Sequence, residues 1–513
     1  MPMLNDIRVS LPSAAILLID ALERAGHEAW CVGGFVRDAL LGRQSHDVDM
    51  ATSAHWRDVK RVCEARGWRT YETGVKHGTL TVVVSSGEMR SAESSAVVEN
   101  NGNARRGSGE RGHGSEQYDD SDGEQHGGCE GCGNSDNDAT HHTDETVVEV
   151  TTYRCDGTYS DARHPADVRF VSTIEEDLAR RDFTINALAY HPTRGFVDPY
   201  GGLDDLQSGV IRAVGDPDKR FAEDALRTLR GCRFCSQLGF RIESETYQAM
   251  LDHKSLLAKV STERVTHELD ALLLGSNVHD ALLATVDVLM FALPELAAMK
   301  GCAQVTKYHI YDVLEHTAYV VQNSPQTRLS RWAALCHDMG KPAAAFFAAD
   351  GVEHFYGHAK VSETLTLAMT KRLLMSNAFQ EKVTTLVRHH DDEVPPTPRG
   401  VRRMLLKLNG DVEMFRALCA LKRADALSQA PEFGADGVAC ADELLRILDE
   451  LIASKDVPSL KTLAVNGRDI LGLGVSQGPK VGRVLAALLD AVVDGDVAND
   501  REALLMRARK LMG

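Results

Sequence analysis

Two aspartates separated by a single residue, Asp47 and Asp49, stand in the segment 46–52, whose composition is typical of a β-strand. Side chains two positions apart on a strand leave the same face, so the two carboxylates are expected side by side. Neighbouring like charges disfavour each other unless a cation lies between them. Hard oxygen ligands suit Mg²⁺, which usually shares its coordination shell with substrate phosphates. The spacing therefore indicates a Mg²⁺ site.

A pair of glycines, Gly33 and Gly34, precedes these acids and opens a short expected helix. Glycine lets the backbone approach a phosphate closely, and the start of a helix presents amide N–H groups to it. Arg37, one turn into that helix, could clamp a triphosphate. Each motif alone is common and could be an ordinary turn beside solvated acids. Their combination within 17 residues favours a site for Mg²⁺ and a nucleoside triphosphate.

The chain has 513 residues, with 57 basic and 74 acidic side chains and a net charge of −17. Residues 85–146 hold 14 acids and 4 bases, so this segment carries −10 of that charge and the rest only −7. The balance argues against nonspecific coating of DNA but allows a local basic face. The scattered cysteines and the lack of a signal peptide or a long apolar run predict a cytoplasmic protein without membrane association.

Residues 86–146 are rich in Gly, Ser, Asp and Asn and have almost no large apolar side chains. Such a segment cannot bury enough surface to offset the entropy of ordering it, so we predict a disordered acidic insertion in a β-hairpin loop. A docking or regulatory role is one hypothesis for it. Four of its residues superficially suggest zinc ligands, although no apolar frame surrounds them: Cys129, Cys132, His141 and His142.

The elements that must position these residues follow from hydrophobic periodicity and glycine stops. Before the insertion, helices and strands alternate: helices are expected over 12–25, 36–42 and 56–67, and strands over 28–34, 46–52 and 78–84. A strand over 145–154 follows the insertion. Beyond about residue 170 the pattern is almost entirely helical, including the segments 175–191 and 221–239.

Histidines and aspartates cluster in the second half of the chain. His316, the adjacent pair His337–Asp338, and Asp425 resemble the H…HD…D pattern of HD phosphohydrolases. Imidazoles and carboxylates from different helices can hold a divalent metal, for which Ni²⁺, Mn²⁺ and Mg²⁺ are candidates. Two further residues are candidate ligands or phosphate contacts: His358 and His389. The alternative interpretation is a degenerate HD domain kept only as a structural unit.

Five blocks in order resemble the tRNA nucleotidyltransferase and poly(A) polymerase family of the bacterial type, class II. They are GGFVRDALLGRQSHDVDMAT, GVKHGTLTVVV, VEVTTYR, EEDLARRDFTINALAY, and the run from DPYGGLDDLQSG to LRTLRGCRF. The resemblance covers about residues 31–270 apart from the insertion. It implies that Glu149 is the third catalytic carboxylate beside Asp47 and Asp49. Without the resemblance, Glu149 would be an ordinary outward strand residue.

The resemblance also implies the nucleotide-binding residues. Arg181 would contact the triphosphate, and Asp182 and Asn186, one helical turn apart, would hold the ribose. The motif EDALRTLRGCRF carries an acid and three arginines at i+3 steps along an expected helix: Asp224, Arg227, Arg230 and Arg233. For an arbitrary helix this would be a solvated, salt-bridged face.

In this family the block reads the incoming base. Asp224 supplies an acceptor and Arg227 a fork of donors, which together can pair with the edge of C or of A. Arg230 and Arg233 would support the phosphates or the base stack.

We therefore expect a CCA tRNA nucleotidyltransferase that adds C, C and A to the tRNA 3' end from CTP and ATP, with Mg²⁺ in a two-metal mechanism. A phosphohydrolase activity of the HD site would be additional. The alternatives are a poly(A) polymerase, a CC-only or A-only enzyme, or a degenerate head on a working HD hydrolase. The segment GWRTYETGVKHGTLTV resembles the flexible loop that CC-only relatives lack, which favours complete CCA addition.

The expected fold class is α+β: a nucleotidyltransferase-type mixed β-sheet head with helices, followed by an all-α neck, body and HD domain. The expected domains are a head over 1–200 with the insertion 86–146, a base-reading neck over 201–300, an HD domain over 301–430, and an RNA-binding body and tail over 431–513. The expected partners are the tRNA 3' end, CTP and ATP. The chain would be a monomer or a homodimer.

Overall fold

The computed structural model describes six stretches of the chain: residues 9–43, 47–85, 145–156, 168–348, 353–454 and 462–512. The predicted insertion lies outside the described residues except for its last two positions, and so does the group Cys129, Cys132, His141 and His142. The described chain divides into two compact units. The first comprises residues up to 153 together with 170–174 and 189–196, and the second comprises 154–169, 175–188 and 197 onward. The predicted domain boundaries stay a prediction.

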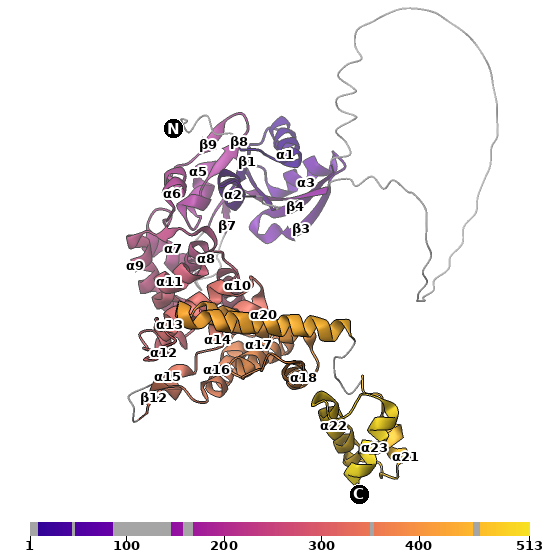
Figure 1. The fold of residues 1–513 in the computed structure, drawn as a ribbon. Helices are drawn as coiled ribbons and strands as arrows, with labels where there is room; N and C mark the ends of the chain where they lie inside the picture. Colours follow the sequence, from indigo (N-terminus) through magenta and orange to yellow (C-terminus); the bar gives the residue numbers. More distant parts are fainter. Residues whose placement is uncertain are drawn as a thin grey trace, which may run out of the picture. The chain divides into compact units, whose positions relative to one another are not determined.

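The first unit is built on a seven-stranded mixed sheet in the order β3-β4-β5-β2-β1-β8-β9. Figure 1 labels β1, β3, β4, β8 and β9 of this sheet. Strands β2 and β5 run parallel, whereas β1 is antiparallel to both β2 and β8. The hairpin strands β3 and β4 are antiparallel, as are β4 and β5. The bounds are β1 Ala29–Val32, β2 Val48–Thr52, β3 Arg69–Gly74, β4 Thr79–Ser85, β5 Glu145–Thr152, β8 Ala189–His191 and β9 Gly195–Val197. This is the mixed sheet that the sequence predicted.

Alternating apolar residues give this sheet one buried face. In β4 and β5 the buried side chains alternate with less buried ones, and the intervening residues are mostly threonines and glutamates, together with Val83 and Val147. The helices α1 (Ser13–Arg24) and α3 (Trp56–Glu64) pack against the sheet, and both bury apolar stripes toward it. The short α2 (Gly34–Leu40) follows β1 directly, and the 3₁₀ turn η2 (Val75–His77) joins β3 to β4. The opposite face of β2 and β5 is therefore left for polar side chains.

The segment 86–144 connects two strands that pair directly. Strands β4 and β5 are in antiparallel register over seven residues, from Thr79 opposite Thr151 to Ser85 opposite Glu145. The prediction that the insertion interrupts a β-hairpin is therefore confirmed.

The segment 175–191 is not the continuous helix that its periodicity predicted. Helix α5 (Ile174–Ala179) ends early, and Phe183 is extended and bridges to Ala213. A 3₁₀ turn, η4 (Thr184–Asn186), follows, and the chain then enters the sheet as β8. The helical prediction was wrong because residues 183–190 are all buried, and complete burial removes the periodicity that separates a helix from a strand.

The second unit is mostly helical (Figure 1). Helix α8 packs against α10 and α11, and α13, α14, α17 and α19 form a further packed group. The bounds up to residue 299 are α6 Gly202–Ser208, α7 Pro217–Glu223, α8 Leu226–Leu238, α9 Ser244–His253, η5 Lys254–Lys259, α10 Thr262–Leu273, α11 Val278–Ala292 and α12 Leu296–Met299. Short strands are β6 Arg154–Asp156, β7 Val168–Phe170, β10 Val210–Ile211 and β11 Arg241–Ile242.

The remaining helices follow in sequence. They are α13 Val313–Asn323, α14 Arg328–Cys336, α15 Lys341–Ala344, α16 His358–Arg372, α17 Asn377–His389, α18 Pro398–Lys407, α19 Val412–Leu427, α20 Pro431–Ala453, α21 Gly467–Gly472, α22 Pro479–Val493 and α23 Arg501–Met512. A small hairpin, β12 (Phe346–Phe347) and β13 (Glu353–His354), lies between α15 and α16. Helices α21 to α23 share an apolar cluster of their own around Ile470 and Leu488.

We predict that Gly202→Ala destabilises the second unit. A Cβ atom at Gly202 would lie 2.1 Å from the carbonyl oxygen of Thr184, so α6 and η4 would have to separate. Overpacking of this kind costs about 1–3 kcal/mol. Gly472→Ala is the matched control, because no atom lies within 4 Å of the Cβ position there. Thermal unfolding followed by circular dichroism should show a lower midpoint for Gly202→Ala only; equal midpoints would contradict the prediction.

Candidate active site

The carboxylates of the first unit lie on two neighbouring strands. Asp49 on β2 is the register partner of Glu149 on β5. Adjacent strands lie about 4.8 Å apart, so two side chains at one register position leave the same face as close neighbours. Asp47 precedes Asp49 by two residues, just before β2 begins. The structure thus brings Asp49 and Glu149 together and sets Asp47 at the entrance to the same strand.

This acidic face is the polar side of the sheet. Asp47 and Glu149 are exposed and Asp49 is half-buried, whereas the residues between them point into the core: Val48, Met50, Val148 and Val150. The neighbouring outward residues on the hairpin are threonines, and Thr79 and Thr151 exchange a hydroxyl hydrogen bond of 3.0 Å. Carboxylate oxygens on an open polar surface of this kind suit hard divalent cations.

The glycine turn lies at the end of β1. Gly33 has a φ of +71°, a conformation that favours glycine. A Cβ atom on Gly34 would lie 3.6 Å from Nη2 of Arg37, so the guanidinium group folds back beside the turn. Arg37 is buried and donates two hydrogen bonds of 2.9 Å, from Nε and Nη2, to the carboxylate of Asp38. Asp38 therefore orients Arg37, a role that sequence reasoning missed.

In the second unit, Asp182 and Asn186 contact each other, although not on the helix that the sequence predicted. Nδ2 of Asn186 donates to Oδ1 of Asp182 over 3.1 Å; Asn186 ends the 3₁₀ turn η4, and Asp182 precedes that turn. The neighbouring Arg181 lies 3.3 Å from Asp177 and also donates to the carbonyl of Asn186. Asp177 is a buried anchor that the sequence did not reveal.

Asp224 does not lie on the helix that carries the arginines. Its backbone is extended and ends α7, and its Oδ1 accepts a hydrogen bond from the amide of Leu226 at the start of α8. Its Oδ2 accepts a hydrogen bond of 2.9 Å from Arg264 on α10. The prediction that Asp224 and the three arginines share one helix face was therefore wrong for Asp224. An aspartate can accept hydrogen bonds from the free amides at the start of a helix, so it tends to precede the helix rather than lie on it.

The three arginines of α8 make contacts within the second unit rather than facing solvent. Arg227 is buried and donates to Glu223 over 2.8 Å and to the carbonyls of Arg220 and Arg180 over 3.0 and 2.8 Å. Arg230 donates to Oδ2 of Asp182 over 2.7 Å. These contacts fix the side chains on which base recognition is proposed to depend.

Glu268 on α10 is the second acid of this network. It lies 3.3 Å from Arg233, and the guanidinium of Arg233 lies over the ring of Phe234. Burial raises the pKa of Glu268, and the neighbouring guanidinium groups of Arg233 and Arg230 oppose that rise. Glu268 was missed by sequence reasoning because it lies 35 residues from its partner.

Asp182 is held as a carboxylate. Burial alone raises the pKa of Asp182, but the charge of Arg230 and the hydrogen bonds from Asn186 and the Phe183 amide outweigh it, so the pKa falls below its ordinary value. The side chain is therefore ionised at neutral pH and able to accept hydrogen bonds.

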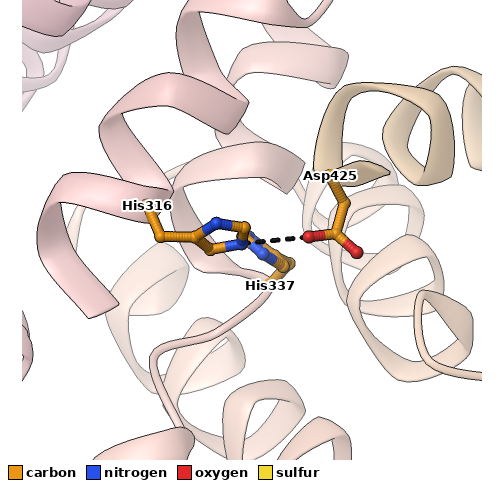
Figure 2. Close-up of side chains that lie close together, drawn as sticks. All are labelled: His316, His337 and Asp425. Atoms are coloured by element: carbon orange, nitrogen blue, oxygen red, sulfur yellow. Dashed lines mark ion pairs between the residues drawn. The ribbon is translucent and has the colours of Figure 1, made fainter. Parts of the chain in front are cut away.

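The histidine cluster is assembled from three helical regions of the second unit. His316 lies on α13, His337 and Asp338 directly follow α14, and Asp425 lies on α19. Figure 2 shows His316 and His337 facing Asp425, and Nε2 of His316 lies 2.9 Å from Oδ1 of Asp425. The ligand atoms of these three residues all lie within 4.8 Å of one another. These are three of the four residues that the sequence predicted as ligands of a divalent metal; the fourth, Asp338, lies next to them, 3.1 Å from Nε2 of His337.

The two candidate additions to the cluster differ in outcome. His358, the first residue of α16, joins the cluster, with its Nε2 3.3 Å from Asp338. His389 instead pairs with Asp392 over 2.9 Å, and its neighbour His390 takes the place beside His358. His389 thus lies outside the cluster of candidate ligands, because adjacent residues at a helix end point in directions about 100° apart and the sequence does not reveal which one faces inward.

The cluster opens into a cavity of about 290 Å³, whose lining includes Asp338, Asp425 and Lys341. Burial raises the pKa of both aspartates, but their histidine neighbours, and Lys341 beside Asp338, outweigh this effect and lower both values. Burial also lowers the pKa of His309 on the cavity wall to about 3. The cavity therefore presents ionised carboxylates and a neutral His309.

Three family models match successive parts of the chain. The poly A polymerase head domain matches residues 29–112 and 124–212, and the "Probable RNA and SrmB- binding site of polymerase A" matches 239–300. The model of tRNA nucleotidyltransferase domain 2 matches 355–508. A CCA-adding enzyme of Lactiplantibacillus plantarum is 31% identical over 97% of this chain and 95% of its own length. The chain belongs to the CCA-adding enzyme family.

Solved structures of CCA-adding enzymes share the fold. The Bacillus stearothermophilus CCA-adding enzyme in complex with CTP is 27% identical, covers 98% of both chains and has a TM-score of 0.65. The Thermotoga maritima CCA-adding enzyme complexed with tRNA is 17% identical with a TM-score of 0.56, which supports the fold alone. The chain is thus a nucleotidyltransferase, and its family implies a divalent metal. Among the described helices, none is long and apolar enough to cross a bilayer.

We predict that Arg230→Gln lowers stability by about 1–2 kcal/mol at pH 7, the value of a charge-assisted hydrogen bond discounted for partial exposure. The folded state depresses the pKa of Asp182, so its contribution is present above the unfolded pKa, about 3.9, and is lost as the pH falls. The gap between variant and wild type should therefore narrow between about pH 5 and pH 3.

Urea unfolding at several pH values measures this gap. Arg446→Gln is the control, since Arg446 pairs with Glu443 and Glu450 on the exposed surface of α20, where an ion pair contributes little. A pH-independent gap for Arg230→Gln would contradict the assigned pairing.

Proposed function

We propose that this chain completes tRNA 3' ends by adding C, C and A from CTP and ATP. The observation that carries the proposal is the register pairing of Asp49 with Glu149 on the polar face of the sheet. Membership in the CCA-adding enzyme family supports the substrates. Association with the tRNA would depend mainly on phosphate contacts and shape.

Asp47, Asp49 and Glu149 would hold two Mg²⁺ ions in the head, and their oxygens on an open face fit this role. When bound, Mg²⁺ would lower the pKa of the RNA 3'-hydroxyl and stabilise the charge of the leaving pyrophosphate. The protein itself supplies alignment. Arg37, oriented by Asp38, and Arg181, oriented by Asp177, would bind triphosphate oxygens with guanidinium groups fixed in advance.

The choice of base would depend on Asp224 and Arg227. Asp224 presents an acceptor fixed by the Leu226 amide and Arg264, and Arg227 presents donors fixed by Glu223 and two carbonyls. A guanidinium fork and a carboxylate can be complementary to the pairing edge of C or A. Asp182 and Asn186 would hold the ribose. Arg230 and Arg233 would act by positioning, since Arg230 holds Asp182 and Arg233 holds Glu268.

We predict that Asp49→Asn lowers nucleotide incorporation at least about 100-fold, since charge stabilisation by a metal contributes several kcal/mol. Asp58→Asn is the matched control, because Asp58 pairs with Arg61 on α3 away from the acidic face. The assay extends a tRNA ending at the discriminator base with CTP, ATP or both. Wild type should add two nucleotides from CTP alone and three from the mixture.

Other product patterns in this assay would identify the alternatives. Repeated addition from ATP alone would indicate a poly(A) polymerase. Termination after two nucleotides in the mixture would indicate a CC-only enzyme. No addition to this tRNA, with addition of A to a second substrate tRNA that ends in CC, would indicate an A-only enzyme. Incorporation that survives Asp49→Asn would refute the assignment of the carboxylates.

A second proposed function is metal-dependent phosphohydrolysis at His316, His337, Asp338 and Asp425. The convergence of His316, His337 and Asp425 beside a cavity supports it, with Asp338 3.1 Å from Nε2 of His337. The residues fit a divalent cation, because neutral imidazoles and ionised carboxylates are metal ligands. A bound metal would polarise a phosphate ester and activate water. Lys341, on the cavity wall, would offer a positive charge to the phosphate.

We predict that the two activities separate. Asp425→Asn should abolish hydrolysis of a 2',3'-cyclic nucleotide or of p-nitrophenyl phosphate in Mn²⁺ while leaving incorporation within about twofold, because no residue of the acidic head face changes. Asp49→Asn should do the reverse, so each variant is the control for the other. The second function would be contradicted if the wild type showed no hydrolysis, or if hydrolysis were lost in Asp49→Asn and retained in Asp425→Asn.

A further inference from the structure

The polar face of the head sheet continues beyond the carboxylates. One register row crosses four strands: Asp49 on β2 is opposite Glu149 on β5, Glu149 is opposite Thr81 on β4, and Thr81 is opposite Tyr71 on β3. The Tyr71 side chain is 47% exposed, so its ring lies open to solvent on this face. The acidic groups thus stand at one end of a surface that extends across the hairpin of β3 and β4.

The part of this face that belongs to the hairpin is polar but not acidic. The hydroxyl groups of Thr73 and Thr81 share a hydrogen bond of 2.7 Å, and the hydroxyl pair of Thr79 and Thr151 lies in the next row. The only acid in β3 and β4 is Glu72, which lies on the opposite face of the sheet and accepts a hydrogen bond from a lysine of α3. The negative charge of the polar face is therefore carried by β5, by β2 and by the entrance to β2.

The glycine turn lies on the other side of the carboxylates. In the strand order β3-β4-β5-β2-β1, strand β1 is on the side of β2 away from the hairpin, and Gly33 directly follows β1. The triphosphate of the incoming nucleotide would bind at that turn, so the pyrophosphate would leave on the side of β1. In a metal-assisted displacement the attacking and leaving oxygens lie in line, on opposite sides of the reacting phosphate. The attacking 3'-hydroxyl must then approach from the side of β5 and the hairpin.

We propose that the unpaired 3' end of the tRNA lies across β5, β4 and β3, with its sugars over the threonine hydroxyls and its penultimate base stacked on Tyr71. Neighbouring strands are about 4.8 Å apart, so Tyr71 lies about 14 Å along the row from Asp49, beyond the terminal nucleotide. An exposed aromatic ring is a stacking platform for any base, and threonine hydroxyls can donate to and accept from a ribose. This inference rests on the proposed CCA addition and assigns a path to its RNA substrate.

The charges around the hairpin suit an RNA strand. Lys76, in the turn η2 between β3 and β4, is exposed, and Arg69 at the start of β3 is exposed beside its ion-pair partner Glu145. A phosphate backbone that crosses the hairpin therefore meets two positive side chains and no carboxylate of β3 or β4 on that face. The 3'-hydroxyl has to reach the carboxylates, so the nucleotides before it need a neighbouring surface of this kind.

A double-mutant cycle between the full-length protein and the RNA tests the proposal. The substrates are a tRNA ending in CC, the same RNA without its penultimate base, and the same RNA without the base of the discriminator nucleotide. The measured quantity is the single-turnover rate at which A is added from ATP. Tyr71→Ala should slow addition to the intact RNA about 5- to 100-fold, the range for loss of one stacked base. It should not slow addition further on the RNA without the penultimate base, but should keep its full effect on the third RNA.

Two further variants separate stacking from structure. Tyr71→Phe keeps the ring and should remain within about twofold of wild type on all three RNAs, because stacking needs only the ring face. Glu72→Ala is the matched control on the same strand, since Glu72 lies on the opposite face. Circular dichroism of each variant verifies that it is folded.

The outcomes also distinguish this proposal from the proposed function. An effect of Tyr71→Ala that is equal on all three RNAs would indicate a structural role and overturn the stacking. A rate on the intact RNA that Tyr71→Ala does not change would overturn it too. Both results would leave CCA addition standing, whereas a wild-type protein that adds no nucleotide to the intact RNA would refute the proposed function itself.

Discussion

The pairing of β2 with β5 is the constraint on which the head depends. Backbone hydrogen bonds between these parallel strands hold Asp49 beside Glu149, although like charges repel. The register is fixed from the other face, where Val48, Met50, Val148 and Val150 are buried. A slip of one residue would turn Glu149 into the core and a valine toward solvent. The hydrophobic core thus sets the spacing of the charges.

The second unit uses a different device to fix its functional groups. Every arginine of α8 is tied to an acid or a carbonyl, and the acids lie on other elements: Glu223 on α7, Asp182 before η4 and Glu268 on α10. Buried ion pairs of this kind contribute modest net stability but penalise any arrangement that separates them. They therefore serve mainly to hold side chains in one orientation, which selection of a nucleotide by protein groups requires.

The strands of the head and the faces of their carboxylates could be predicted from the sequence, because the spacing of residues in a short motif determines which side chains share a face. Two aspartates in a DxD motif on a strand must share one face, and the valines on either side of Glu149 in VEV show that Glu149 faces away from the core. The alternation of apolar and polar residues on both sides of 86–144 predicted two strands, which pair with each other. The predictions from sequence were wrong where complete burial hides the periodicity of an element, or where the rotation of a helix decides which residue faces inward. The fully buried segment 183–190 has no periodicity to distinguish η4 and β8 from a helix. His389 and His390 differ only in which one faces inward. Partners distant along the chain, such as Glu268 and Arg264, also left no local signal.

The carboxylate set is divided by the long segment between β4 and β5: Asp47 and Asp49 precede it, and Glu149 follows it. The two sides are joined by the seven-residue ladder of that hairpin and by the ladder of β2 and β5. Continuity of the covalent chain through 86–144 therefore adds little to what already holds the acids together. In evolutionary terms, this hairpin is a permissive junction, where length and composition can drift without moving the reactive groups.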